Sequence, residues 1–343
     1  MEKEYKYIVA TRCFTFNHAP YVEDALRGFA IQETTFPVVY IIVDDASKDG
    51  EPDVLRHWAS ENLNANGTVL WRDMPYGQLA VAPLKNKTQS TFVILLLSEN
   101  HYKKLNKKFE YISEWHTNAK YNALCEGDDY WTDPYKLQKQ VDFLDNHPDY
   151  TMCFHMADIK VENGASRTNY FVELEDREYT PQDIIPKWII PTHSMVWRSN
   201  ISDIWLSIMP NFIFGDDVLY ASCLREGKIW GMSQKMGVYR IVPTGWMLTH
   251  KGKDRHYSNI FQRKALMKEF VFYRCEENYK YMEKRYFELM YELLKERNWT
   301  ELKKVRTDYK ETLSNRPKFG FQIYILKRFL SPVVNAIKRN KAS

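Results

Sequence analysis

The sequence predicts an α/β protein with a mostly parallel sheet, helices on both faces of that sheet, and a C-terminal helical extension. Two observations carry this prediction. Uninterrupted apolar segments of strand length alternate with segments whose apolar residues recur at helical spacing, as in parallel sheets covered on both faces. After about residue 250, long helical patterns rich in Lys and Glu replace the apolar strands. We therefore expect a sheet domain over residues 1–250 and a helical region over 251–343.

The first half of the sheet domain follows a strand, helix, strand order. YIVATRCFTF reads as a buried strand, and YVEDALRGFAIQ after it has helical spacing. PVVYIIV is a second apolar strand, and it ends abruptly in the acidic turn 44–50. Because ligands of such sheets bind beyond the carboxyl ends of the strands, this turn is a candidate binding segment. A helix (DVLRHWASEN) and a strand (TVLWR) are expected next.

Residues 73–118 interrupt this pattern, since they place one apolar stretch within polar, Lys-rich surroundings. We interpret them as an insertion. KYNALC is then a short strand, and further on a helix is expected near 200–209. The chain continues with an acidic turn, a helix that ends at Gly227, and two short strands.

Composition limits the possible classes of protein. With 343 residues, 44% hydrophobic and 27% charged, the chain is globular and long enough for one large domain or two ordinary ones. The net charge of +4 is mild, and we expect no nucleic-acid partner. Five widely spaced cysteines favour a reduced, cytoplasmic compartment. No apolar run is long enough to span a bilayer, so we expect a soluble or peripherally attached protein.

The segment CEGDDYW at 125–131 places three carboxylates within four positions and no Lys or Arg among them. A solvated acidic turn is one interpretation. A divalent cation is the other, because it converts the repulsion between carboxylates into coordination. Asp44-Asp45 also follows an apolar strand, so the two acidic sites are expected to converge at one edge of the sheet. Such an edge suits Mg²⁺ or Mn²⁺ bound to an anionic ligand such as a diphosphate.

The order of these motifs resembles that of the family 2 glycosyltransferases over roughly residues 5–245. The family's first strand ends in a turn similar to FTFN, and its V-D-D-G-S-x-D-G motif is matched by VDDASKDG. Its D-x-D element is matched by CEGDD, and its acidic motif at the start of a helix by Gly215-Asp216-Asp217. The resemblance implies the GT-A fold, which has a Rossmann-like sheet, and an inverting enzyme that depends on a nucleotide sugar.

Carried over residue by residue, the resemblance implies a role for each acidic residue. Asp216 is the implied catalytic base, with Asp217 as second choice, and Asp128 is the implied metal ligand. The implied nucleotide-sugar contacts are Thr15, Asp44, Asp45, Glu126 and Asp128. Adjacent strand residues point to opposite faces, so we expect only one of the first two aspartates to reach the ligand directly. Two positions depart from the family pattern: Glu126 replaces the first Asp of D-x-D, and Val242 stands where the family often has His.

The function implied is transfer of a sugar, with inversion, from a nucleoside-diphosphate donor to a saccharide or lipid-linked acceptor. For this family in bacteria, cell-envelope polysaccharide or lipopolysaccharide synthesis is the expected setting. Two alternatives stay open at this stage: a metal-dependent nucleotidyltransferase, and a non-catalytic sugar- or membrane-binding relative. A nucleotidyltransferase usually needs a Gly-rich or basic loop near the first strand to bind the triphosphate. Residues 10–20 contain one Arg and no Gly.

The C-terminal stretch 317–341 is both basic and apolar. Phe319, Ile323, Leu326 and Leu330 fall at helical spacing, with six Lys and Arg residues around them. One interpretation is an amphipathic tail that attaches the protein peripherally to the inner face of the cytoplasmic membrane. The other is a helix that packs its apolar side on the protein itself.

Overall fold

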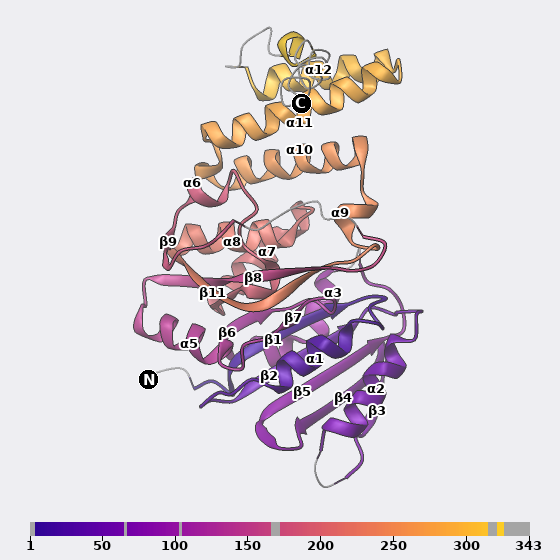
Figure 1. Cartoon of the computed structure of the whole chain (residues 1–343), viewed down its shortest axis with the longest axis vertical. Helices are drawn as coiled ribbons and strands as arrows, with labels where there is room; N and C mark the ends of the chain where they lie inside the picture. Colours follow the sequence, from indigo (N-terminus) through magenta and orange to yellow (C-terminus); the bar gives the residue numbers. More distant parts are fainter. Residues whose placement is uncertain (1–3, 65–66, 103–104, 166–171, 315–320, 326–343) are drawn as a thin grey trace, which may run out of the picture. The chain divides into compact units, whose positions relative to one another are not determined.

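The computed structural model describes residues 4–64, 67–102, 105–165, 172–314 and 321–325. The chain forms two compact units, Met1–Leu248 and Thr249–Ser343. The first unit contains the sheet, and the second is helical (Figure 1).

Four parallel strands form the centre of the sheet, in the spatial order β5, β2, β1, β6. Strand β2 is buried along its whole length, which explains why its sequence shows no alternation of apolar and polar residues. Thr15 at the end of β1 pairs with Asp44 at the end of β2, so these carboxyl ends meet at one edge. The strands are β1 (Tyr7–Thr15), β2 (Val38–Asp44), β5 (Lys87–Leu97) and β6 (Ala119–Leu124).

Strands of mixed direction extend the sheet beyond β6. Strand β10 (Val196–Arg198) is antiparallel to β6 and to β8 (Tyr150–Val161), and β11 (Lys228–Ile241) runs parallel to β8. Strands β7 (Tyr130–Trp131) and β9 (Arg177–Tyr179) both pair with β11. Where we expected two short strands, β11 is one long strand, because register shifts between Met232 and Gly237 carry it past three exposed polar residues.

On the other side of the centre, β3 (Trp71–Met74) and β4 (Gly77–Leu84) continue the sheet from β5 as antiparallel neighbours. The segment 73–118, interpreted above as an insertion, therefore supplies strands β4 and β5 to the sheet itself. Strand β4 alternates buried and exposed residues, as expected for a strand near an edge. Because of its exposed residues, this strand is difficult to recognise in the sequence. The second half of the segment contains α3 (Leu105–Tyr111) and α4 (Ser113–His116).

Helices cover both faces of the sheet, and the predicted α/β fold class is confirmed. Val9 and Cys13 of β1 belong to a core shared with α1, α2 and α5. Arg12 and Phe14, at the alternate positions, contact α3 and α7 on the opposite face. The remaining helices of this unit are α1 (Val22–Ala30), α2 (Glu51–Asn62), α5 (Lys136–Asn146), α6 (Pro181–Ile184), α7 (Asn200–Ile208), α8 (Gly215–Glu226) and α9 (Trp246–Thr249), with the 3-10 turns η1 (Thr192–Ser194) and η2 (Met209–Asn211).

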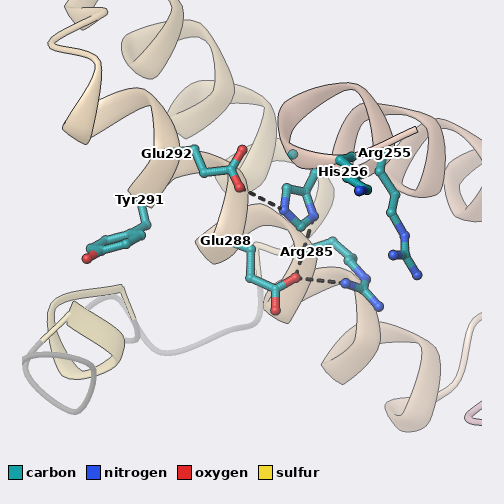
Figure 2. Close-up of a pocket in the computed structure, with 8 residues that line it drawn as sticks. Arg255, His256, Arg285, Glu288, Tyr291 and Glu292 are labelled. Atoms are coloured by element: carbon teal, nitrogen blue, oxygen red, sulfur yellow. Dashed lines mark hydrogen bonds and ion pairs between the residues drawn. The ribbon is translucent and has the colours of Figure 1, made fainter. Parts of the chain in front are cut away.

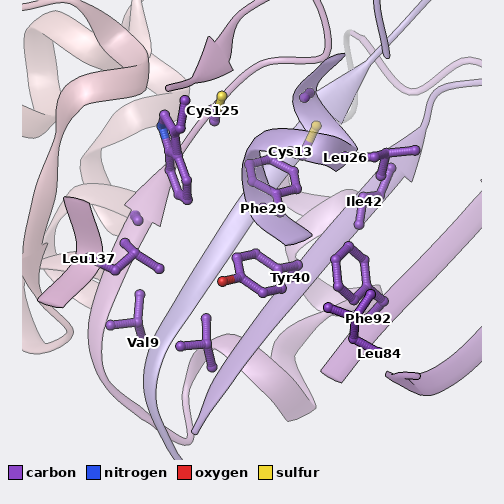
Figure 3. Packing of buried hydrophobic residues seen from close by; sticks show 14 of the residues in the cluster. Val9, Cys13, Leu26, Phe29, Tyr40, Ile42, Leu84, Phe92, Cys125 and Leu137 are labelled. Carbon is purple, nitrogen blue, oxygen red and sulfur yellow. The ribbon is translucent and has the colours of Figure 1, made fainter. Parts of the chain in front are cut away.

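A chain of aromatic rings runs through the core under α1 (Figure 3). Phe29 of α1 stacks on Tyr40 of β2 at 5.2 Å between ring centroids, and Tyr40 contacts Phe92 of β5 at 4.9 Å. Trp131 meets Phe29 edge-on at 5.0 Å. Full burial of each such side chain contributes about 1.5–3 kcal/mol, so these rings fix α1 on the sheet.

Within its described residues, the second unit is helical and has its own apolar core, as the Lys- and Glu-rich helical patterns predicted. Helix α11 (Glu276–Lys295) contacts both α10 (Gly252–Glu269) and α12 (Trp299–Thr312), and η3 (Val271–Tyr273) links the first two. Tyr286 and Leu289 lie at the centre of this core. The side chain of Asn298 accepts a hydrogen bond from the Glu301 amide at 3.2 Å and caps α12.

Little of the predicted basic tail lies within the described residues. Phe321 and Tyr324 pack against Phe287 of α11, each at 5.6 Å, whereas Ile323 is exposed. Leu326, Leu330 and most of the basic residues lie outside the described part of the chain. Among the described helices, none is long and apolar enough to cross a bilayer.

Candidate active site

Three acidic or polar turns meet at one edge of the sheet, as the parallel strand order predicts. The turn after β6 packs directly on the end of β1, because the Gly127 amide donates to the Phe14 carbonyl at 3.3 Å. A Cβ atom at position 127 would overlap the Thr15 side chain, so this approach requires glycine. The segment CEGDDYW is therefore held against the ends of β1 and β2.

Glu51, a residue that sequence reasoning missed, ties these turns together. Its side chain is fully buried and accepts hydrogen bonds from the Thr15 hydroxyl, the His18 amide and the Ser47 hydroxyl, the last two at 2.8 Å. Since these partners come from the turns after β1 and β2, Glu51 fixes both turns at once. Thr15 is thus buried and already engaged. In the sequence, Glu51 reads only as an acidic residue in the first turn of a helix.

Asp44 lies at a pocket of about 380 Å³ formed at the ends of β2 and β5. Its Oδ2 accepts the Ser47 amide at 3.3 Å, while its Oδ1 has no hydrogen-bond partner among the described residues. Burial raises the pKa of this carboxyl to about 6. A buried carboxylate oxygen without a donor favours a ligand that brings an N–H or O–H group. The pocket is lined by Asp44, Ala46, Ser47, Lys48, Pro52, Arg56, Gly77, Gln78, Leu96, Leu97 and Ser98.

Asp45 has different neighbours. Its Oδ2 accepts from the Lys108 ammonium at 2.9 Å, and its Oδ1 accepts the His101 amide at 2.6 Å. The Asp45 and Lys108 side chains are only 5% and 6% exposed. The carboxylate that the resemblance pairs with Asp44 as a nucleotide contact is therefore occupied by the segment before and within α3. Lys108 therefore lies buried, although the surrounding sequence is polar and rich in Lys.

Glu126 and Asp128 form the open part of the acidic cluster. Part of the Glu126 side chain is exposed to solvent. Its pKa is raised well above the ordinary value, first by desolvation of the carboxyl and then by the charges of Asp128, Asp129 and Asp216. Asp128 is half-buried, and its Oδ2 lies 3.9 Å from His18 Nε2.

Asp129, the third carboxylate of the motif, is buried and serves the fold. Its Oδ1 accepts the Arg240 amide at 2.7 Å, and its Oδ2 lies 3.1 Å from His193 Nδ1. Burial, and then the charge of Asp128, raises the pKa of Asp129, while burial lowers the pKa of His193 to about 3. Asp129 and His193 thus join the acidic turn to β11 and to η1.

Asp216 and Asp217 open α8, and the structure distinguishes them. Asp216 lies near enough to Glu126 for its charge to raise the pKa of that residue. Burial, and then the charge of Asp217, raises the pKa of Asp216 to about 7. Asp217 instead accepts a hydrogen bond from the Tyr220 hydroxyl of its own helix. Asp216 is therefore the carboxylate of this pair that belongs to the acidic cluster.

Tyr239 of β11 shows how closely the cluster is gathered. Burial, and then the charges of Asp129, Glu126, Asp128 and Asp216, raises the pKa of its phenol. The charges of carboxylates from two separate stretches of the chain, 126–129 and the start of α8, thus act on one side chain.

A divalent cation fits the chemistry of Glu126 and Asp128. No three His, Cys, Asp or Glu side chains among the described residues form a preassembled metal site. Mg²⁺ commonly takes only one or two protein carboxylates and completes its shell with phosphate oxygens and water. The raised pKa of Glu126 indicates uncompensated negative charge, which a cation would relieve.

A second pocket, of about 260 Å³, lies between α10 and α11 in the helical unit (Figure 2). His256 lies between Glu288 and Glu292, at 3.5 and 3.6 Å, and Arg285 donates to Glu288 at 2.8 Å. Glu288 is thus paired with Arg285, while burial lowers the pKa of His256.

No family model matches the sequence. Uncharacterized proteins of Mycobacterium bovis and Mycobacterium tuberculosis are 34% identical to it over 228 residues, which is 66% of this chain and 56% of theirs. The chain therefore spans little more than half the length of these relatives.

Two solved structures resemble the fold. S. aureus TarS, residues 1–349 in complex with UDP-GlcNAc, superposes with a TM-score of 0.52 and 13% identity, over 82% of this chain and 70% of that one. The mannosyltransferase PcManGT from Pyrobaculum calidifontis, in complex with GDP-Man and Mn²⁺, superposes with a TM-score of 0.51 and 12% identity. The match covers 97% of this chain and 84% of that one. The chain has the GT-A-like fold of these glycosyltransferases, followed by C-terminal helices.

Proposed function

We propose that this protein is an inverting glycosyltransferase of family 2, which moves a hexosyl or related sugar from a nucleoside-diphosphate donor to a saccharide or lipid-linked acceptor. The observation that carries the proposal is one edge of a parallel sheet. There Asp44 lines a pocket, and its strand partner Thr15 packs against the turn that carries Glu126 and Asp128. The charge of Asp216 acts on Glu126. Glycosyltransferases of the same fold bind UDP-GlcNAc and GDP-Man, which supports a donor of this kind.

The pocket beside Asp44 holds the nucleoside in this proposal. The unpaired Oδ1 of Asp44 accepts a hydrogen bond from the base or ribose. Asp45 acts indirectly, because its carboxylate is held by Lys108 and the His101 amide. Thr15 likewise shapes the pocket through its bond to Glu51.

Asp216 is the base. The acceptor hydroxyl attacks the anomeric carbon of the donor in line with the leaving diphosphate, so the new C–O bond forms as the bond to the diphosphate oxygen breaks. The hydroxyl proton moves to the Asp216 carboxylate during this displacement. A pKa near 7 suits this role, because the group is then ionised in part at neutral pH and still basic enough to accept the proton.

Asp128, with Glu126 beside it, would hold Mg²⁺ or Mn²⁺. The metal ion would neutralise charge on the leaving diphosphate. PcManGT binds Mn²⁺ together with its donor, which supports a metal requirement here.

The acceptor and cellular setting rest on the family resemblance. We infer a cytoplasmic enzyme, working at the inner face of the membrane in cell-envelope polysaccharide or lipopolysaccharide synthesis.

The proposal is tested by nucleotide binding and by turnover. Purified protein is screened for thermal stabilisation by nucleoside diphosphates with Mn²⁺ or Mg²⁺, and for release of the diphosphate from a panel of nucleotide sugars. We expect stabilisation that needs both nucleotide and metal. Asp216→Asn is expected to keep donor binding and to lose turnover by about 10²–10⁴-fold, because an amide cannot accept the proton.

Asp217→Asn is the matched control, since it makes the same change one residue further along α8. We expect it to keep most of the turnover. No stabilisation by any nucleoside diphosphate with metal would overturn the proposal, and equal losses in the two variants would remove Asp216 from the role of base.

A further inference from the structure

Arg12 of β1 is a charged residue in an apolar setting. Its side chain is fully buried, and none of its three guanidinium nitrogens makes a hydrogen bond with a described residue. Burial lowers its pKa to about 9, so it stays charged at neutral pH. A buried charge without a partner is strongly unfavourable unless its surroundings compensate it.

Three aromatic rings supply that compensation. The guanidinium carbon lies 4.8 Å from the centre of the Trp197 ring and 5.1 Å from each of the Phe109 and Trp205 rings. Cation–π contacts of this kind are stronger when the cation is removed from water, as it is here. The rings come from β10, α3 and α7, so this group, the Arg12 box, joins three elements to the central strand.

Trp205 extends from the box to the candidate active site. Its indole Nε1 donates to the carbonyl of Gly215 at 2.9 Å, and Gly215 directly precedes Asp216. The same ring underlies Gly215, because a Cβ atom there would lie 3.4 Å from Trp205 Cζ2. Trp205 is only 5% exposed, so its ring position is set by packing. The start of α8 therefore rests on a side chain that the box holds in place.

We propose that Trp205 is a positioning residue for Asp216, with its indole N–H holding the Gly215 carbonyl and the Arg12 box holding the indole. This inference rests on the proposed function, since it concerns the base of that reaction. The net contribution of one hydrogen bond is enough to change a rate about tenfold when the bond orients a catalytic group.

The test compares Trp205→Phe with Trp58→Phe. Trp58 is equally buried, but it packs against Phe92 on the other face of the sheet. Trp205→Phe should lower kcat about tenfold while the KM for the donor changes less than about twofold, because the nucleotide pocket is untouched. Trp58→Phe should lower thermal stability by a similar amount and leave kcat unchanged.

A second readout does not depend on turnover. The Asp216 carboxyl is titrated by ¹³C NMR in both variants, and in Trp205→Phe its pKa should fall towards the ordinary value as water reaches the loosened turn. If the wild-type protein transfers no sugar from any donor, the proposed function fails, and this titration still decides whether Trp205 positions Asp216.

Should Trp205→Phe fail to fold, position 205 is replaced by β-(3-benzothienyl)alanine, which keeps the ring shape and removes only the N–H donor. Unchanged kcat and unchanged Asp216 titration, with reduced thermal stability alone, would show that Trp205 is a packing residue and overturn the inference.

Discussion

At the scale of single residues, the carboxylates of one short motif have separate tasks because their hydrogen bonds differ. Asp129 is buried and bonds to the Arg240 amide and to His193, so it joins strands. Asp128, one position earlier, is half-buried, and its Oδ2 lies 3.9 Å from His18 Nε2. Adjacent residues of similar chemistry therefore separate into one that supports the fold and one that is open to a ligand.

This difference gives a paired prediction. Asp128→Ala should abolish metal-dependent nucleoside-diphosphate binding and leave thermal stability close to that of the wild type. Asp129→Ala should destabilise the first unit by about 1–3 kcal/mol, because it leaves buried donors unsatisfied. Isothermal titration calorimetry and thermal melts on both variants check this. Wild-type affinity in Asp128→Ala would rule out its assignment as the metal ligand.

The pH dependence of activity follows from Asp216. A base must be ionised to accept a proton, and burial raises the pKa of Asp216 to about 7. We expect kcat/KM to rise with pH, with an inflection near 7, and to lie about tenfold below its plateau at one pH unit beneath it. A pH–rate profile on saturating metal measures this. A profile already flat above pH 5 would mean that no group with such a raised pKa limits the reaction.

At the scale of elements, α3 illustrates how a short helix is fixed by a few buried contacts. Lys108 binds Asp45 at the end of β2, and Phe109 packs edge-on against Phe14 of β1 at 5.3 Å. Consecutive residues of one helix thus reach two neighbouring strands. The helix therefore holds the edge of the sheet where the candidate nucleotide pocket begins.

The contribution of the Lys108–Asp45 ion pair to stability can be measured by comparing substitutions at Lys108 and at the adjacent Lys107. Lys108→Met should lower the unfolding free energy by about 3 kcal/mol, because it leaves a buried carboxylate without its partner. Lys107→Met is the control, since Lys107 is 56% exposed and its pair with Glu110 should contribute less than about 1 kcal/mol. Urea titrations measure both.

A double variant separates charge from shape. Asp45→Asn combined with Lys108→Met removes both charges and should recover most of the lost stability. Equal, small effects of the Lys107 and Lys108 substitutions would contradict the assignment of a buried ion pair.

Much of this arrangement could be predicted from the sequence. Buried parallel strands are recognisable because their apolar residues are contiguous, and the acidic turns at 44–50 and 125–131 follow those strands directly. Glu51 and Lys108 could not be recognised, because their roles depend on partners 36 and 63 positions away. Strand β4 was missed for a related reason: near an edge, its alternating pattern resembles polar linker sequence.

At the scale of the whole molecule, the chain combines a sheet unit and a helical unit, each with its own core. Phe321 and Tyr324 pack against the helical core, and the predicted tail after residue 325 lies outside the described residues. The six basic residues counted over 317–341 include five beyond this point.

A truncation tests membrane attachment by the tail. Deleting residues 326–343 should abolish sedimentation with anionic liposomes at low salt, because each basic residue near an anionic leaflet contributes roughly 1 kcal/mol. The melting temperature should not change, since Phe321 and Tyr324 are retained. Substituting Ser at Lys338, Arg339 and Lys341 in the full chain should weaken sedimentation in part. A drop in melting temperature, or an intact protein that ignores liposomes, would favour the packing interpretation.

The Arg12 box also has a consequence for the order of folding. Its cation lies on the first strand, yet the rings that compensate its desolvation come from residues 109, 197 and 205. A nascent chain that has emerged only as far as β6 would have to bury this charge without two of its three rings, so the first strand must stay hydrated on that face. We therefore expect the face of the central strands that carries Arg12 to complete its packing only after Trp205 has left the ribosome.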